Sequence, residues 1–245
     1  MSSIIEVKNL NTILGDKKIH ENLNFFINSG EIFAIIGGSG SGKTVLLREL
    51  LGLITPYSGT IKILGVNAHR EKRRFKKILE NDIGVLFQSG GLISSLNVIQ
   101  NVVLPIKEKT NLKIDIINEL GLLKLKMANF PLESIFLYPS ELSGGMVKRA
   151  ALARSLIMDP KILFLDEPTS GLDPVSANLF NETIGKLRDL LNITIVIITH
   201  DLSTINSIVD RMIVLLKGKI IAQGRVDEVK RTDHPWIKQY FQINI

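Results

Sequence analysis

The chain has 245 residues, 45% of them hydrophobic, which is enough for one large domain or a core with a small subdomain. It lacks cysteine, which excludes a disulfide framework and a cysteine-based metal site. We see neither a signal peptide nor an apolar run approaching the ~18–20 residues that span a bilayer, so we expect a soluble, cytoplasmic protein. The formal net charge of +6 suits an acidic ligand, a membrane surface or nucleic acid, and does not choose among them.

The first part of the chain alternates between apolar runs and turn residues. Residues 11–18, which include Gly15 and Asp16, are expected to form a hairpin turn. Strands are expected on both sides of this turn and further along, at residues 4–10, 23–27, 32–36 and 60–64. This order predicts an antiparallel β segment that leads into an α/β core.

A glycine-rich loop separates the strand at 32–36 from an apolar helical pattern at 45–51. The loop consists of Gly37, Gly38, Ser39, Gly40, Ser41, Gly42, Lys43 and Thr44. The P-loop pattern requires this order of strand, loop and helix. Glycines let backbone N–H groups surround a phosphate, and the N-terminus of the helix faces the same anion. We therefore expect nucleotide binding, with Lys43 reaching the β- and γ-phosphates and the Thr44 hydroxyl ligating Mg²⁺.

A dense basic run follows at residues 69–77. One interpretation is a patch for anionic lipid or nucleic acid, and the other is a solvated helix face. We favour the solvated face, because Phe75 alone interrupts the charge.

Gln88 ends an expected strand at residues 83–88. A polar residue at the carboxyl end of a core strand is placed to face a ligand in an α/β sheet, although one such residue is a weak signal. Residues 97–126 then follow a helical pattern with little β character. This pattern predicts an inserted helical subdomain over about residues 89–158.

Ser143 is expected to cap a strong helix at residues 147–156. Gly144 and Gly145 have no side chains and leave the backbone N–H groups of its first turn accessible. This is either a second anion-binding helix start, about a hundred residues after the first, or an ordinary N-cap.

Two adjacent carboxylates follow a buried strand at residues 162–165. Side chains alternate along a strand, so Asp166 and Glu167 cannot point in one direction. We expect Asp166 to hold Mg²⁺ and Glu167 to orient or deprotonate the attacking water. The alternative is a solvated acidic pair in a turn.

Another buried strand, at residues 193–199, ends at His200. This places His200 at the same carboxyl edge as Gln88 and Asp166, where open α/β sheets bind ligands. Asp173 lies in a turn-rich connector, where it is a candidate cap for the next helix.

The last part of the chain predicts a hairpin of strands at 211–216 and 219–222, followed by an aromatic helix at 234–241. Trp236 and Tyr240 are partners four residues apart on this helix. They either pack on their own domain, which we favour, or contact a partner protein.

Three of these motifs, in this order along the chain, resemble the ATP-binding cassette (ABC) family. Residues 37–44 look like its Walker A motif, residues 142–146 like its signature and residues 162–167 like its Walker B motif. Its Q-loop, D-loop and switch histidine are matched by Gln88, residues 170–173 and His200.

The resemblance implies a single ABC ATP-binding domain over residues 1–245, with a short C-terminal tail at 227–245. Its fold would be an α/β P-loop NTPase core with an antiparallel β subdomain and an inserted helical subdomain. The implied cofactors are ATP and Mg²⁺. The implied catalytic residues are Lys43, Gln88, Glu167 and His200, and the implied magnesium ligands are Thr44, Gln88 and Asp166.

The resemblance also implies a head-to-tail homodimer with two shared ATP sites. Ser143 and Gly145 of one copy would contact the γ-phosphate held by the P-loop of the other, with Gly144 and Asp173 as further nucleotide contacts. The family pairs such subunits with integral-membrane permeases and hydrolyses ATP to move a solute.

Two residues depart from the family pattern. Leu14 stands where the family often has an aromatic residue for stacking on adenine, and Met146 replaces the usual glutamine of the signature. A finer resemblance is to the ATPases of Mla/MCE-type lipid transporters. It rests on Met146, residues 87–92 and the His-Pro-Trp tail. That implies phospholipid traffic between inner and outer membranes, an MCE-domain lipid-binding protein as a further partner, and a peripheral position on the cytoplasmic face of the inner membrane.

Two alternatives remain open: an ABC ATPase for another solute, and a non-transport ABC ATPase acting on nucleic acid. Against the second, no long charged coiled-coil insertion separates the P-loop from the signature, so we expect no nucleic-acid partner. The segment after Gln88 is apolar enough to receive a permease helix. The residues expected to do so are Leu92, Ile93, Leu96, Val98, Ile99, Val102, Val103 and Leu104.

Overall fold

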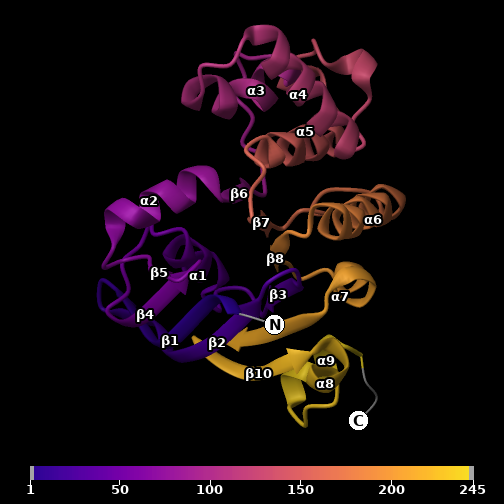
Figure 1. Cartoon of the computed structure of the whole chain (residues 1–245). Coiled ribbons are helices and arrows are strands. Elements are labelled where there is room, and N and C mark those ends of the chain that lie inside the picture. The colour runs from indigo at the N-terminus through magenta and orange to yellow at the C-terminus, as the bar shows by residue number, and fades with distance from the viewer. Residues whose placement is uncertain (1–2, 243–245) are drawn as a thin grey trace. The chain divides into compact units, whose positions relative to one another are not determined.

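The computed structural model describes residues 3–242 (Figure 1), so residues 1–2 and 243–245 of the expected domain and its tail lie outside the described residues. The chain divides into two compact units, one made of residues 1–80 and 196–245 and the other of residues 81–195. Both units contain strands and helices, which confirms the predicted α/β class. No helix among residues 3–242 has the length and apolar character needed to cross a membrane.

The first unit contains a four-stranded antiparallel sheet in the order β2-β1-β4-β5, as the predicted β subdomain requires. Its strands are β1 (Ser3–Leu14), β2 (Lys17–Asn28), β4 (Ser58–Ile63) and β5 (Val66–Asn67). The prediction that residues 11–18 form a turn is wrong except at Gly15 and Asp16. Pairing continues to the end of the hairpin, where Leu14 lies opposite Lys17, because Gly15 adopts the positive φ of 58° that a two-residue turn needs.

The same unit contains the strand that precedes the P-loop. All five residues of β3 (Ile32–Ile36) are buried. This strand pairs in parallel with β9 (Arg211–Leu216), which pairs in antiparallel with β10 (Lys219–Arg225). The predicted closing hairpin is therefore confirmed, and its second strand is longer than expected.

The helices of the first unit are α1 (Lys43–Leu50), α2 (Lys72–Asn81), α7 (Leu202–Ile208), α8 (Val226–Lys230) and α9 (Pro235–Tyr240). The basic run at residues 69–77 leads into and forms most of α2, where Phe75 is the buried side chain. The other side chains of residues 72–77 are exposed, so this run forms a solvent-facing helix surface, and its preference for solvent over an anionic ligand stays a prediction.

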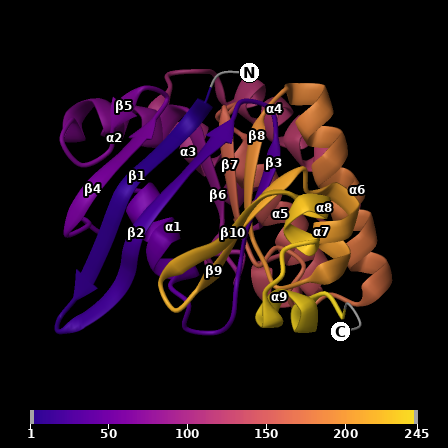
Figure 2. The same cartoon turned by 90° about the horizontal axis from the view of Figure 1, so that it is seen from below.

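The aromatic tail packs on its own unit, as we favoured. Ile237 of α9 is fully buried in an apolar cluster with Ile36 of β3 and Val214 of β9. The rings of Trp236 and Tyr240 stack with centroids 4.7 Å apart and pack against this cluster. Figure 2 shows α8 and α9 beside β10.

The second unit contains the parallel pair β6 (Ile83–Leu86) and β7 (Ile162–Asp166). Its helices are α3 (Val98–Lys109), α4 (Ile114–Met127), η1 (Leu132–Ser134), η2 (Pro139–Glu141), α5 (Gly144–Leu156) and α6 (Pro174–Leu191). The chain passes from the second unit into the first within β8 (Thr194–Ile198). Strand β6 ends two residues earlier than predicted, which leaves Gln88 in a turn.

Helices α3, α4 and α5 pack on one another, as the predicted helical region requires (Figure 1). This packing corrects the expected permease surface. Val98, Ile99, Val102 and Val103 are each at most 8% exposed and belong to the core. The helices approach so closely that a Cβ at Gly121 would lie 2.5 Å from Val103, so these four side chains cannot receive another helix.

Candidate functional site

The P-loop follows β3 and opens helix α1, in the predicted order. Gly37, Gly40 and Gly42 all have positive φ values, which side chains rarely tolerate. A Cβ at Gly37 would lie 2.0 Å from the carbonyl oxygen of Leu215. These glycines therefore allow both the turn of the loop and its close approach to β9.

Lys43 folds back over the loop, since its Nζ donates to the carbonyl oxygens of Gly37 at 2.7 Å and of Gly38 at 3.0 Å. The N-cap of α1 is Gly42, which supplies no side-chain cap, and the first turn contains no acid. Uncapped N–H groups at a helix start, next to an ammonium group, favour an anion. The loop therefore fits the phosphates of a nucleotide.

A buried polar cluster beneath the loop was not predicted. Thr12, His20 and Glu49 are all fully buried. The Glu49 carboxylate accepts from the Thr12 hydroxyl at 2.6 Å and lies 3.0 Å from His20 Nδ1. His20 Nε2 lies 3.2 Å from the carbonyl oxygen of Gly42, which can only accept, so this nitrogen carries the hydrogen. The cluster thus joins β1 and β2 to the start of α1.

Glu167 follows β7 with a positive φ of 46°, an uncommon conformation for a residue with a side chain. Its backbone carbonyl accepts from Lys148 Nζ at 3.0 Å, and the carbonyl of Gln88 accepts from the same group at 2.5 Å. Lys148 is only 5% exposed. Burial lowers the pKa of Lys148, and the negative charges of Asp166 and Glu167 partly offset this effect.

Lys148 belongs to α5, the helix that the signature residues open. The same helix carries Arg154, whose guanidinium donates to the carbonyl of Gly90 at 3.1 Å. Two cations of one helix therefore hold the backbone of the loop that contains Gln88. Sequence reasoning missed both, because a buried cation that binds backbone carbonyls has no spacing pattern.

Gln88 and Ser170 are brought together in the second unit, with 3.5 Å between Gln88 Nε2 and Ser170 Oγ. Ser143 caps α5 as predicted, accepting from the backbone N–H of Met146 at 3.3 Å. Gly144 and Gly145 form the first turn of that helix.

Asp173 caps α6, and its carboxylate accepts from the N–H groups of Val175 and Ser176 at 3.0 Å each. The hydrogen bonds from Ser176 hold the pKa of Asp173 below its usual value. The capping role predicted for Asp173 is thus confirmed, while its contact with a nucleotide stays a prediction.

His200 lies between β8 and α7, and its side chain is exposed. Its backbone carbonyl accepts from the Tyr240 hydroxyl at 2.9 Å. Asp201 caps α7 through Ser203 and Thr204.

The first unit thus carries the P-loop, His200 and the exposed Leu14, and the second carries Gln88, Ser143, Asp166, Glu167 and Asp173. Across residues 3–242, no group of three or more histidine or acidic side chains is arranged to hold a metal ion. Mg²⁺ commonly binds with one or two protein oxygens, phosphates and water, so this finding does not bear on the magnesium ligands expected from the sequence.

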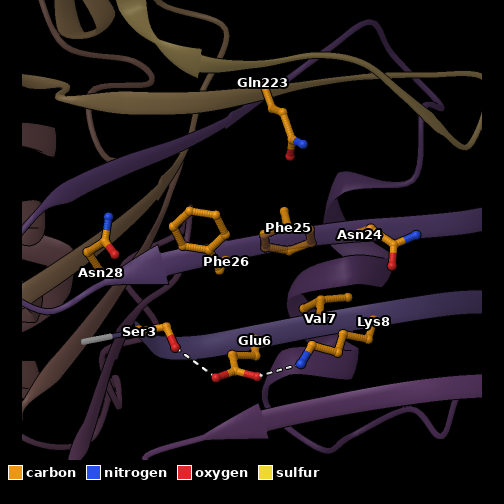
Figure 3. Close-up of a pocket in the computed structure, with 9 residues that line it drawn as sticks. All are labelled: Ser3, Glu6, Val7, Lys8, Asn24, Phe25, Phe26, Asn28 and Gln223. Carbon is orange, nitrogen blue, oxygen red and sulfur yellow. Dashed lines mark hydrogen bonds and ion pairs between the residues drawn. The ribbon is translucent and has the colours of Figure 1, made fainter. Parts of the chain in front are cut away.

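A hollow of about 550 Å³ lies away from the P-loop, on the strands β1 and β2 and on Gln223 of β10 (Figure 3). Its acid, Glu6, already accepts from Ser3 at 2.7 Å and pairs with Lys8 at 3.2 Å. The charged groups of this hollow are therefore paired with each other, and the P-loop remains the stronger candidate.

Comparison with known proteins gives matches over nearly the whole chain. A family model described as ABC transporter matches residues 20–170. The intermembrane phospholipid transport system ATP-binding protein MlaF of Haemophilus influenzae is 37% identical over 240 residues, which cover 98% of this chain and 90% of that protein. A Mycobacterium leprae protein named "Probable ribonucleotide transport ATP-binding protein mkl" is 34% identical over 240 residues, covering 98% of this chain and 69% of that protein.

A solved dimeric ATP-binding cassette, in a post-hydrolysis state with ADP and Pi bound, matches with a TM-score of 0.83 at 29% identity. The match covers 91% of this chain and 98% of that chain.

Proposed function

Because the chain belongs to the ABC transporter family, we propose that it is the ATP-binding and ATP-hydrolysing subunit of a phospholipid transporter acting between inner and outer membranes. The observation that carries the proposal is the P-loop geometry, in which positive-φ glycines, Lys43 and the uncapped start of α1 belong to one short segment. The full-length similarity to MlaF supports the choice of phospholipid.

In the proposed mechanism, loop N–H groups and Lys43 bind the β- and γ-phosphates of ATP. Thr44, Gln88 and Asp166 would hold Mg²⁺, which neutralises phosphate charge when bound. Glu167 orients the attacking water and accepts its proton. His200 is the remaining proposed catalytic residue.

The proposed active form is a head-to-tail homodimer with two shared ATP sites. Ser143, Gly144 and Gly145 of one copy, together with its Asp173, complete the site on the P-loop of the other. The uncharged start of α5 supports this role, since its first turn contains no acid that would repel a phosphate. The solved dimeric cassette that this chain resembles provides a precedent for such pairing.

The proposed partners are integral-membrane permease subunits and an MCE-domain lipid-binding protein, with the chain peripheral on the cytoplasmic face of the inner membrane. Because part of the segment after Gln88 is buried, we assign the permease-binding surface to exposed apolar side chains of the proposed helical subdomain, residues 89–158. Phe136 is 71% exposed and Ile93 is 40% exposed. The segment of Phe136 lies against the start of α3, where Val98 N–H donates to the carbonyl of Leu137 at 3.0 Å.

Phosphate release by the full chain tests the ATPase part of the proposal. Glu167→Gln is expected to bind ATP normally and to hydrolyse it about 10²–10⁴-fold more slowly, because a positioned base is removed. Glu182→Gln, a change at a 64% exposed side chain, is the matched control and is expected to behave as wild type. A Glu167→Gln variant that turns over at the wild-type rate would remove Glu167 from this role.

Affinity purification from detergent-solubilised membranes tests the transport part. We expect a permease and phospholipid to co-purify with the wild-type chain, and Phe136→Asp to reduce recovery of the permease while ATP binding persists. Recovery of a permease with a different solute would favour the second candidate, transport of another substrate, which the name of the mycobacterial relative motivates. Salt-dependent DNA binding without membrane association would contradict the proposal.

A further inference from the structure

The C-terminal helix α9 is bonded to the segment that carries His200 and packs next to the strand that leads into the P-loop. The Tyr240 hydroxyl donates to the backbone carbonyl of His200 at 2.9 Å. At the other end of the helix, a Cβ added at Gly38 would lie within 3.9 Å of the indole nitrogen of Trp236. One short helix therefore lies close to Gly38 of the P-loop and is hydrogen-bonded to the segment that carries His200.

The helix is firmly held where these contacts are made. Ile237 is fully buried, and Trp236 and Tyr240 stack at an interplanar angle of 13°. His234 caps the helix, with its Nδ1 accepting from the N–H of Trp236 at 3.1 Å. The two aromatic side chains thus form one rigid platform, because each limits the rotation of the other.

The backbone around His200 is fixed on both sides. Thr199 Oγ1 accepts from the N–H of Asp201 at 3.0 Å, and Asp201 in turn caps α7. The Tyr240 hydroxyl adds a bond at His200 itself, from a residue 40 positions later. Fixing the carbonyl of a residue restrains its ψ angle and so the direction in which its side chain leaves the backbone.

We propose that α9 is a positioning element of the ATPase site, in which Tyr240 sets the backbone of His200 and Trp236 seats the same helix against the P-loop. Tyr240 is a positioning residue, since its hydroxyl acts through the backbone of His200. This inference rests on the proposed ATP hydrolysis.

The test compares Tyr240→Phe, which keeps the ring and its stacking, with Tyr57→Phe, the same change at a side chain that is 74% exposed. We measure kcat by phosphate release from the full chain, ATP affinity with a fluorescent analogue, and Tm by circular dichroism. Tyr240→Phe is expected to lower kcat about two- to tenfold, the effect of losing one hydrogen bond, with ATP affinity within about twofold of wild type. Tyr57→Phe is expected to change none of these quantities.

A double variant separates positioning from general stability. In a His200→Ala background, Tyr240→Phe is expected to lower kcat no further, because the residue it positions is gone. An equal further loss in that background, or a fall in ATP affinity that matches the fall in Tm, would overturn the proposal. A wild-type chain that does not hydrolyse ATP would overturn the proposed function, whereas an active wild type with an equally active Tyr240→Phe variant would overturn this inference alone.

Discussion

Lys148→Met removes the ammonium that holds the backbone after β7 while keeping a side chain of similar length. In the wild type, this ammonium donates to the carbonyls of Gln88 and Glu167. Both carbonyls lose a charged donor in the variant, while Glu167 still has to adopt its positive φ of 46°. We expect both the free energy of unfolding and kcat to fall.

The size of the effect can be worked from these contacts. A hydrogen bond from a charged donor contributes about 1.5–3 kcal/mol, and two are lost. Part of this loss is offset, because the variant no longer buries an ammonium. A net loss of about 2 kcal/mol remains, which lowers the Tm of a chain of this length by about 4–8 °C. A misplaced Glu167 is expected to lower kcat about 10- to 100-fold.

The pH dependence provides a second measure of the same group. Because the pKa of Lys148 is lowered in the folded state, the unfolded chain binds more protons between that lowered pKa and 10.5. The free energy of unfolding therefore rises with pH in this window, and Lys148→Met is expected to lose that contribution.

Thermal unfolding, denaturant titration and phosphate release measure these quantities. Lys186→Met, at a side chain that is 80% exposed, is the matched control and is expected to leave all of them unchanged. ATP affinity is expected to persist in Lys148→Met, since the P-loop belongs to the other unit. A Lys148→Met variant with the Tm and kcat of the wild type would refute the reasoning.

Lys43→Ala is expected to weaken ATP binding in titrations, whereas Ser143→Arg is expected to spare binding and block ATP-driven dimerisation in light scattering. Equal losses of binding would argue against a shared site. Burial lowers the pKa of His69 below 6.5 in the folded chain. As the pH drops through 6.5, the unfolded chain therefore binds a proton at this residue before the folded chain does, and the free energy of unfolding falls. His69→Asn is expected to flatten this fall in urea titrations between pH 7.5 and 5, and an unchanged slope would contradict the assignment. Glu49→Leu leaves His20 without its carboxylate and is expected to cost about 3–5 kcal/mol, with partial recovery when His20→Leu is added. A double variant less stable than Glu49→Leu alone would count against the pairing.

Short motifs could be predicted because their function requires a fixed local order. The P-loop needs a strand before it and a helix after it, and Ser143 needs a helix to cap, so each carries its structural context in the sequence. The α/β class and the antiparallel β segment followed from periodicity in the same way.

Long-range placement could not be predicted from the sequence. Val102 and Ile93 are both apolar and close in sequence, yet Val102 is in the core and Ile93 is 40% exposed. The difference in exposure arises because α3 packs on α4 and α5, which covers Val102 and leaves Ile93 accessible. His20 and Glu49 form a pair although 29 positions separate them in the sequence. Tyr240 bonds to a backbone carbonyl, and because every residue has one, the sequence does not indicate which carbonyl is the partner.

The parallel pairing of β3 with β9 also fixes an order of events during synthesis. Ile32 donates its N–H to the carboxylate of Asp210, 178 positions further along the chain. Strand β3 is entirely apolar, and because it precedes β9 by more than 170 residues it emerges from the ribosome long before β9 exists. A nascent chain that ends before residue 211 has the nucleotide loop attached to an unpaired, aggregation-prone strand edge. The pairing of β9 with β3 therefore covers this edge only after nearly the whole chain has been made.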